Sequence, residues 1–200
     1  MTDTQKKPLW KNELVWLFLI TSGLFAILYS KFILGGYAYV FTDTGADTMQ
    51  INYAQYGLFS SLFRSGESGY VLQAGLGMDV SSYYPAYLIP YNLLILLAPQ
   101  RLLPWAVLAS AYLKMITISL VGYLFYRKLM QDGIGTMAAA LAWTFSGYVI
   151  LWGQHYGFCT CMALFTVFMY FLQCYLNGEQ RWKSAGLVIT VTMLLISSYY

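Results

Sequence analysis

The sequence predicts an all-α polytopic membrane protein, and three observations support this. Only 10% of the 200 residues are charged and 59% are hydrophobic, whereas soluble domains have roughly one quarter charged residues. Several apolar runs reach the ~20 residues that a helix needs to cross the hydrocarbon core of a bilayer. The 19 tyrosines and six tryptophans are typical of a chain with many rings at headgroup depth.

The length rule predicts four complete spans and the beginning of a fifth. They cover residues 14–34, 104–126, 134–152 and 158–176, followed by an incomplete run at 185–200. The first run follows a basic start, but it exceeds the ~7–15 residues of a signal-peptide core and no small-residue cleavage site follows it, so we expect a retained helix. Because residue 200 falls inside an apolar run, we expect residues 1–200 to be the N-terminal part of one transmembrane domain in a longer protein.

The lysines and arginines predict the orientation of these spans. If the N-terminus is cytoplasmic, seven of the 11 basic residues fall on the cytoplasmic side: Lys6, Lys7, Lys11, Arg127, Lys128, Arg181 and Lys183. This distribution follows the excess of basic residues in the cytoplasmic loops of membrane proteins. The segment 35–103 is then a long extracytoplasmic loop.

A loop of this length is usually functional or folded in its own right. Within "MQINYAQYGLFSSLFRSG" the apolar positions recur every three or four residues, at Ile51, Ala54, Leu58 and Leu62. This spacing predicts an amphipathic helix that lies on the outer leaflet and ends at Gly66. The run "AYLIPYNLLILLAP" at 86–99 is interrupted by Pro90 and is too short to span comfortably, so we interpret it as a re-entrant or interface-lying helix.

Asp43 and Asp47 are the candidate chemical residues of this loop. In a helix, positions i and i+4 lie on one face, so the two carboxylates would repel each other. They are tolerated if both face water, if a cation or basic substrate lies between them, or if burial keeps one protonated. The alternative is that they only cap a helix start. If the protein uses a divalent metal ion, this pair is its expected ligand set; the sequence identifies no other cofactor.

Lys114 is the most informative charge within a span. It lies ten residues beyond Pro104, too deep to reach water easily, and burying it unpaired costs at least a few kcal/mol. It either holds an anionic group such as a lipid phosphate or pairs with a carboxylate from a helix outside this sequence. His155, in a short outer connection, is either a solvated loop residue or a base or ligand. We take Lys114, His155 and the loop residue Arg64 as candidate substrate-binding residues.

Composition excludes some functions. The net charge of +3 is small and the basic residues form no stripe, so we expect no nucleic-acid partner. Cys159, Cys161 and Cys174 lie in one apolar segment and show no disulfide or zinc spacing, which indicates buried small hydrophobic residues. No Walker or dinucleotide-binding pattern surrounds the glycines of the loop.

Five segments, in their order and spacing, resemble the bacterial YfhO membrane protein family over about residues 35–160. They are "YVFTDTGADTMQINYAQY", "LFRSGE", "QAGLGMDVSSYYPAYLIPYNLL", "LPWAVLASAYLKMITISLVGYLFY" and "ALAWTFSGYVILWGQHYGF". Such proteins resemble glycosyltransferases of the GT-C fold, which are bundles of transmembrane helices. The resemblance implies a multi-pass enzyme of the bacterial cell membrane with its active face outside. It would transfer a sugar from a polyprenyl-phosphate donor to a cell-envelope polymer such as lipoteichoic acid in Gram-positive bacteria.

The resemblance also implies residue roles. Asp43 would be the catalytic base, Asp47 the second carboxylate or metal ligand, and Lys114 a contact to the carrier phosphate or a member of a structural ion pair. The chain departs from the family at Ile89–Leu94, where "IPYNLL" replaces "DPFNLL", so a required third loop carboxylate is in doubt. Two other functions stay open: a transporter or flippase for a lipid-linked envelope precursor, and a non-catalytic membrane scaffold.

Overall fold

The computed structural model describes residues 12–41, 48–72, 77–81, 87–130, 132–179 and 181–197, with the side chain of Arg181 left out. Within these ranges the chain is mostly helical. Three helical stretches are long and apolar enough to cross a membrane: Gln100–Leu129, Gly133–Gln154 and Tyr156–Leu176. The helical content and these three apolar helices confirm the prediction of an all-α membrane protein.

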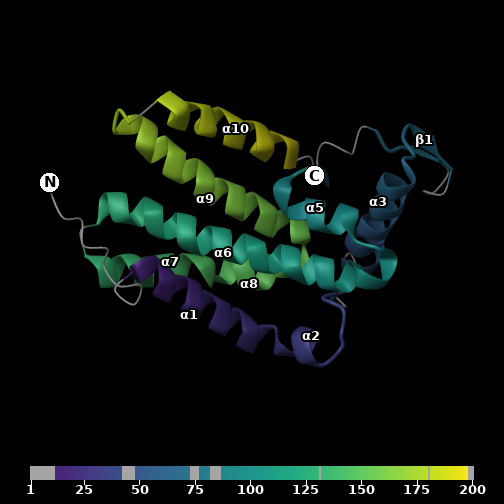
Figure 1. Ribbon diagram of the computed structural model, residues 1–200, viewed down its shortest axis with the longest axis horizontal. Helices are drawn as coiled ribbons and strands as arrows, with labels where there is room; N and C mark the ends of the chain where they lie inside the picture. The colour runs from purple at the N-terminus through teal and green to yellow at the C-terminus, as the bar shows by residue number, and fades with distance from the viewer. Residues whose placement is uncertain are drawn as a thin grey trace, which may run out of the picture.

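One long central helix, α6 (Leu103–Leu129), organises the bundle (Figure 1). The helices that pack against it are α1 (Glu13–Leu28), α5 (Pro90–Leu97), α7 (Gly133–Thr144) and α9 (Tyr156–Leu176). A further helix, α10 (Arg181–Ser197), packs on α9. Pro104 suits the first turn of α6, where its missing N–H would have no helical partner. Arg127 and Lys128 lie in the last turn, where cations interact favourably with the helix dipole.

Helices α6 and α9 cover the second and fourth predicted spans, but the helix of the first is broken. Helix α1 has 16 residues, about 24 Å long at 1.5 Å per residue, and Tyr29 separates it from the short α2 (Ser30–Leu34). At Tyr29 the backbone leaves helical geometry (φ −100°, ψ 16°). The Tyr29 ring is buried and stacks on Phe25, with ring centroids 4.3 Å apart.

The third predicted span is also interrupted. Helix α7 ends at Thr144, and the chain continues as α8 (Gly147–Leu151) and the 3₁₀ turn η4 (Trp152–Gln154). Between them Ser146 has an extended backbone (φ −61°, ψ 154°), and a Ser–Gly pair is a common cause of such breaks. Apolar length predicted both spans, but it contains no information about breaks within them.

The long loop contains a helix where the sequence predicts an amphipathic one, and one face of that helix packs inside the protein. A π-helical turn, η2 (Thr48–Tyr53), leads into α3 (Ala54–Ser65), which ends at Gly66 with φ 72°. Of the predicted apolar face, Ile51 and Ala54 are exposed and Leu62 is buried, and contact of this face with the outer leaflet stays a prediction. The buried side chains of α3 are Tyr56, Phe59, Ser60 and Leu62. Aromatic rings bury far more area than alanine, so the rings determine which face packs against α5.

The rest of the described loop leads towards α6. A hairpin that the sequence did not predict pairs β1 (Tyr70–Val71) with β2 (Met78–Asp79), and Gly77 before β2 has φ 106°. Helix α5 begins at Pro90, which therefore starts the helix and does not interrupt it. The 3₁₀ turn η3 (Gln100–Leu102) joins α5 to α6.

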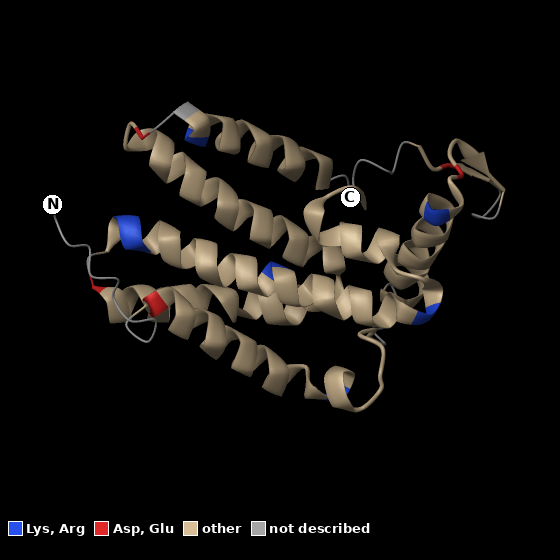
Figure 2. Cartoon of the chain, in the orientation of Figure 1, with Lys and Arg blue, Asp and Glu red and all other residues tan. Residues whose placement is uncertain are grey.

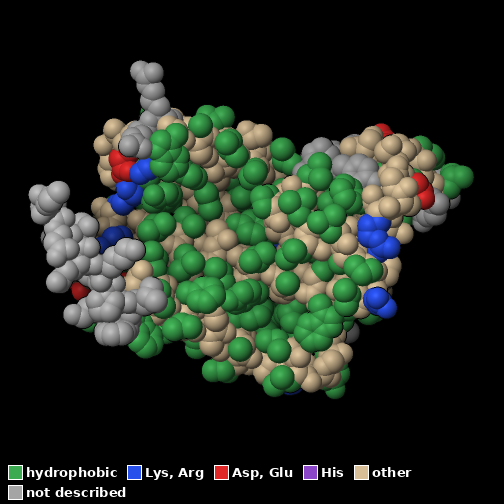
Figure 3. Space-filling view, viewed as in Figure 1, with side chains coloured by type: hydrophobic (Ala, Val, Ile, Leu, Met, Phe, Trp, Pro, Cys, Tyr) green, Lys and Arg blue, Asp and Glu red, His purple; other side chains and the backbone are tan. Residues whose placement is uncertain are grey.

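Charged residues lie at the two ends of the bundle, with one basic position halfway along α6 (Figure 2). The face between the two ends shows mainly hydrophobic side chains (Figure 3). This distribution is the one expected of helices that cross a hydrocarbon layer.

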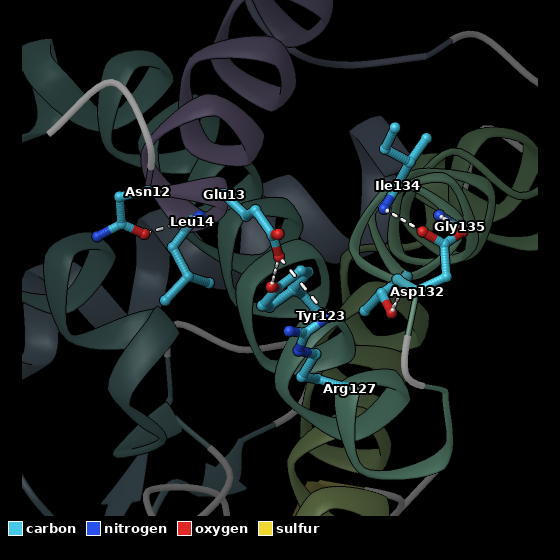
Figure 4. A network of polar contacts seen from close by, with 9 residues as sticks. Asn12, Glu13, Leu14, Tyr123, Arg127, Asp132, Ile134 and Gly135 are labelled. Carbon is cyan, nitrogen blue, oxygen red and sulfur yellow. Dashed lines mark hydrogen bonds and ion pairs between the residues drawn. The ribbon is translucent and has the colours of Figure 1, made fainter. Parts of the chain in front are cut away.

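We call one of these ends the ionic end. Its charged side chains are Glu13, Arg127, Lys128, Asp132, Glu179 and Lys183. Tyr123 donates a hydrogen bond to Glu13, which also lies 4.0 Å from Arg127 (Figure 4). Asp132 caps α7 by accepting from the backbone N–H groups of Ile134 and Gly135, at 3.2 and 2.8 Å. The contacts at the ionic end therefore link the beginning of α1 to the end of α6 and cap the beginning of α7.

Candidate functional site

Lys114 lies inside the bundle. It is 2% exposed, and its Nζ donates to the backbone oxygen of Tyr156 at 3.1 Å. Because Tyr156 is the first residue of α9, this helix begins beside the middle of α6. Lys114 lies about 20 Å along the α6 axis from Arg127. If Arg127 marks one membrane surface, Lys114 is about two thirds of the way across a ~30 Å hydrocarbon core.

Ser110 lies one turn before Lys114 on the same face of α6. It is 1% exposed, and its Oγ has no hydrogen-bond partner among the described residues. Buried hydroxyls are nearly always hydrogen-bonded in native proteins. This pair therefore presents a buried ammonium group and a buried hydroxyl with spare hydrogen-bonding capacity.

An aromatic cluster packs beside this pair. Its members are Phe25, Tyr29, Phe32, Tyr39, Phe41, Tyr56, Phe59, Tyr87 and Tyr156. Tyr156 connects them to the lysine: its ring stacks on Tyr56 at 5.4 Å, and its hydroxyl donates to the backbone oxygen of Tyr39. The hydroxyl of Tyr39 donates to the backbone oxygen of Gly153 at 3.2 Å. Burial raises the pKa of the Tyr39 phenol far above its ordinary value, so it stays neutral.

A small cavity lies between Lys114 and the aromatic cluster. Its lining residues are Tyr29, Tyr39, Tyr56, Ile95, Val107, Ser110, Ala111, Lys114, Met115, Gly153, Tyr156 and Cys159. The volume open to the centre of a water molecule is ≈ 10 Å³, which is about enough for one water. The cavity can therefore hold a single water molecule or one atom of comparable size beside the lysine.

Asp43 and Asp47 lie outside the described residues, and their predicted role stays a prediction. The described residues that flank this segment, Phe41 and Thr48, both contact residues at or next to the cavity. The Phe41 ring lies 5.2 Å from that of Tyr39, and the Thr48 hydroxyl donates to the backbone oxygen of Gln154 at 3.0 Å. Tyr39 lines the cavity, and Gln154 follows the lining residue Gly153.

His155 and Arg64 do not line the cavity. The His155 ring lies 5.6 Å from Trp152 and 5.4 Å from Phe158 and is not part of the cavity lining. Arg64 donates from a guanidinium N–H to the backbone oxygen of Ala98 at 3.2 Å. Ala98 is the C-cap of α5, so Arg64 stabilises a helix end. Lys114 is the one predicted site residue that the described structure places at the cavity.

The structure adds cavity residues that sequence reasoning missed, above all Ser110, Tyr39 and Tyr156. The spacing of Ser110 and Lys114 in "SAYLK" was a usable signal, because two polar residues four apart in an apolar helix share a face. Tyr39 and Tyr156 gave no signal, since they are far apart in sequence and are only two of 19 tyrosines.

The three cysteines are free thiols. Cys159 and Cys174 are buried, as predicted, and Cys161 is partly exposed. Among the described residues no group of three His, Cys, Asp or Glu side chains could hold a metal ion. The metal ligands suggested by the sequence, Asp43 and Asp47, lie outside those residues.

Comparisons with models of protein families, with curated proteins and with solved structures give no match for this chain. The class that the fold and composition define is a helical membrane protein. Its described interior contains a buried lysine beside a small cavity lined with tyrosines.

Proposed function

We propose that the protein is a membrane glycosyltransferase of the GT-C type. It transfers a sugar from a polyprenyl-phosphate donor to an extracytoplasmic cell-envelope acceptor such as lipoteichoic acid. The observation that supports this most is the position of the buried Lys114 cavity. The chain lies close to it at Phe41 and Thr48, on both sides of the two aspartates that the resemblance selects as catalytic.

The proposed chemistry needs a base and a positive charge. Asp43 takes the proton from the acceptor hydroxyl as that oxygen attacks the anomeric carbon of the donor sugar, which requires a carboxylate within hydrogen-bond reach. Asp47 assists as second carboxylate or metal ligand. Lys114 balances the negative charge of the carrier phosphate in a region of low dielectric, where such a charge acts strongly.

The exposed apolar faces of the bundle suit a lipid-linked donor. Apolar side chains are exposed along α1 and α9, for example Trp16, Phe18, Phe158 and Phe165, and a polyprenyl chain would lie against such side chains within the bilayer. An envelope acceptor would approach from the side of α3 and the hairpin, which in the predicted topology face the outside.

Substitution of Asp43 by Asn tests this proposal. We expect sugar transfer to fall by about 10²–10⁴-fold, the range typical for loss of a general base, while the protein remains in the membrane fraction. The measurement is transfer of labelled sugar in proteoliposomes supplied with polyprenyl-phosphate donor and acceptor.

Asp79 provides a matched control. It lies in the same loop, where it accepts hydrogen bonds from the backbone N–H and hydroxyl of Ser81 at 3.0 and 2.6 Å. These hydrogen bonds hold its pKa below the ordinary value. Asp79→Asn should leave transfer unchanged. Full activity in Asp43→Asn, or equal losses in both variants, would contradict the assignment.

The breaks in the first and third spans favour a second candidate. Discontinuous transmembrane helices are typical of transporters, so a flippase for a lipid-linked precursor remains the alternative. Vesicles with the donor already in the outer leaflet separate the two functions, because a transferase modifies an external acceptor there and a flippase does not.

A further inference from the structure

We infer that Lys114 and Ser110 form a binding site inside the helix bundle for one anionic group, either a small free anion or a terminal oxygen of a lipid phosphate. This inference goes beyond the proposed sugar transfer. It depends on described residues of α6, α9 and the aromatic cluster, and it needs neither Asp43 nor Asp47.

The first argument is the number of hydrogen-bond donors. An ammonium group has three N–H donors, and that of Lys114 gives one to the backbone oxygen of Tyr156. The Ser110 hydroxyl is buried and has no partner in the part of the chain that the structure describes. Both residues line the same cavity. Both residues therefore have donors without partners beside the same cavity, which is the supply of donors that an anion requires.

The second argument is charge balance. The three ion pairs in the described structure all belong to the ionic end, and none includes Lys114. An ammonium group buried without a counter-charge costs several kcal/mol. A bound anion would offset this cost by direct attraction and hydrogen bonds, more than a neutral water molecule would.

The third argument is size. The cavity has room for about one water molecule, so a sugar or nucleotide does not fit. A halide ion fits, as does one terminal oxygen of a larger oxyanion whose remainder lies outside the cavity. Free inorganic anions and lipid phosphate share this chemistry, and the experiment separates them.

The test measures anion-dependent stability of the purified full-length chain. In detergent, bromide replaces bulky gluconate at constant ionic strength while the unfolding temperature is recorded. In the second arm the protein is reconstituted without halide in phosphatidylglycerol or phosphatidylcholine vesicles. We expect a saturable rise of the unfolding temperature with bromide, with anionic vesicles, or with both. The arm that responds identifies the source of the anion.

Three variants connect the response to the site. Lys114→Met should abolish it, and Ser110→Ala should raise the half-saturating bromide concentration about fivefold, or reduce the phosphatidylglycerol effect, as expected for one hydrogen bond. Ser119→Ala is the matched control, because Ser119 is equally buried on α6 but its hydroxyl bonds to Thr21 at 2.7 Å. Its anion response should equal that of the wild type.

The outcomes are distinct. If neither arm shows a response, or if the response is unchanged in Ser110→Ala or equally weakened in Ser119→Ala, the site is refuted. If Lys114→Met does not fold, the anion response of Ser110→Ala decides whether the site exists, because this variant keeps the positive charge of Lys114. Sugar transfer is not part of the readout, so this inference and the proposed function can fail independently.

Discussion

At the scale of single residues, Glu179 shows how charge stabilises the ionic end. Both of its carboxylate oxygens are contacted, one by Lys128 at the end of α6 and one by Lys183 in α10. The hydrogen bonds from Lys128 and then Lys183 lower the pKa of Glu179 to about 2. One carboxylate therefore joins α6, the connection after α9, and α10.

The lowered pKa gives Glu179 a predictable pH dependence. A carboxylate whose pKa is lower in the folded state stabilises the fold above its ordinary pKa, and this stabilisation is lost as the pH falls towards the folded-state pKa. We expect the unfolding temperature of the wild type to decrease between pH 5 and pH 3. Glu179→Gln should start lower at pH 6 and decrease less over the same range. Parallel curves for the two proteins would show that these ion pairs do not contribute.

At the scale of elements, α1 is attached to α6 by polar contacts between helices. Thr21 and Ser119 share a buried hydrogen bond of 2.7 Å, and the hydroxyls of Ser22 and Tyr112 share one of 2.8 Å. Membrane helices lack a strong hydrophobic drive to associate in lipid, so packing and such hydrogen bonds hold them together. These contacts fix the antiparallel register of the two helices.

A double-mutant cycle measures the contact between Thr21 and Ser119. We expect Thr21→Val and Ser119→Ala to be coupled by about 0.6 kcal/mol, and at most ~1.7 kcal/mol, the range found for hydrogen bonds between membrane helices. The measurement is reversible unfolding in mixed micelles.

Thr192→Val with Ser119→Ala is the control cycle. The Thr192 hydroxyl bonds to the backbone oxygen of Val188 within its own helix, so this pair should show no coupling. Equal coupling in the two cycles would mean that the first value does not report the α1–α6 contact.

At the scale of the whole molecule, the charges suggest how the bundle lies in a membrane. Arg127 and Lys128 of α6 and Lys183 of α10 meet at the ionic end. The sequence predicts that this end is cytoplasmic. Helix α3 and the hairpin lie at the opposite end (Figure 1), which would then face outward.

Labelling of single cysteines tests this orientation. Ser68 and Asn177 are exposed at opposite ends of the molecule. In intact cells a membrane-impermeant maleimide should label Ser68→Cys and should reach Asn177→Cys only after permeabilisation. The wild-type chain, with its three mostly buried cysteines, gives the background. The reverse pattern would invert the predicted topology.

Sequence reasoning was most reliable for features that the length and composition of a segment determine by themselves. The spans of α6 and α9, and the end of α3 at Gly66, were predictable because apolar runs of ~20 residues and a helix-ending glycine act locally. The candidate site was only partly predictable. Lys114 stood out because a charge within an apolar run is costly wherever the chain folds, whereas Asp43 and Asp47 remain predictions.

The tertiary structure decided which residues meet. The breaks at Tyr29 and Ser146 let the chain bring Tyr39 and Gly153 to Lys114, and the hydrogen bond between Tyr156 and Tyr39 links positions 117 residues apart. The buried face of α3 was likewise decided by its rings packing against α5. The sequence by itself determined a helical membrane protein with one costly buried charge. The surroundings of that charge depend on long-range packing, which no local pattern encodes.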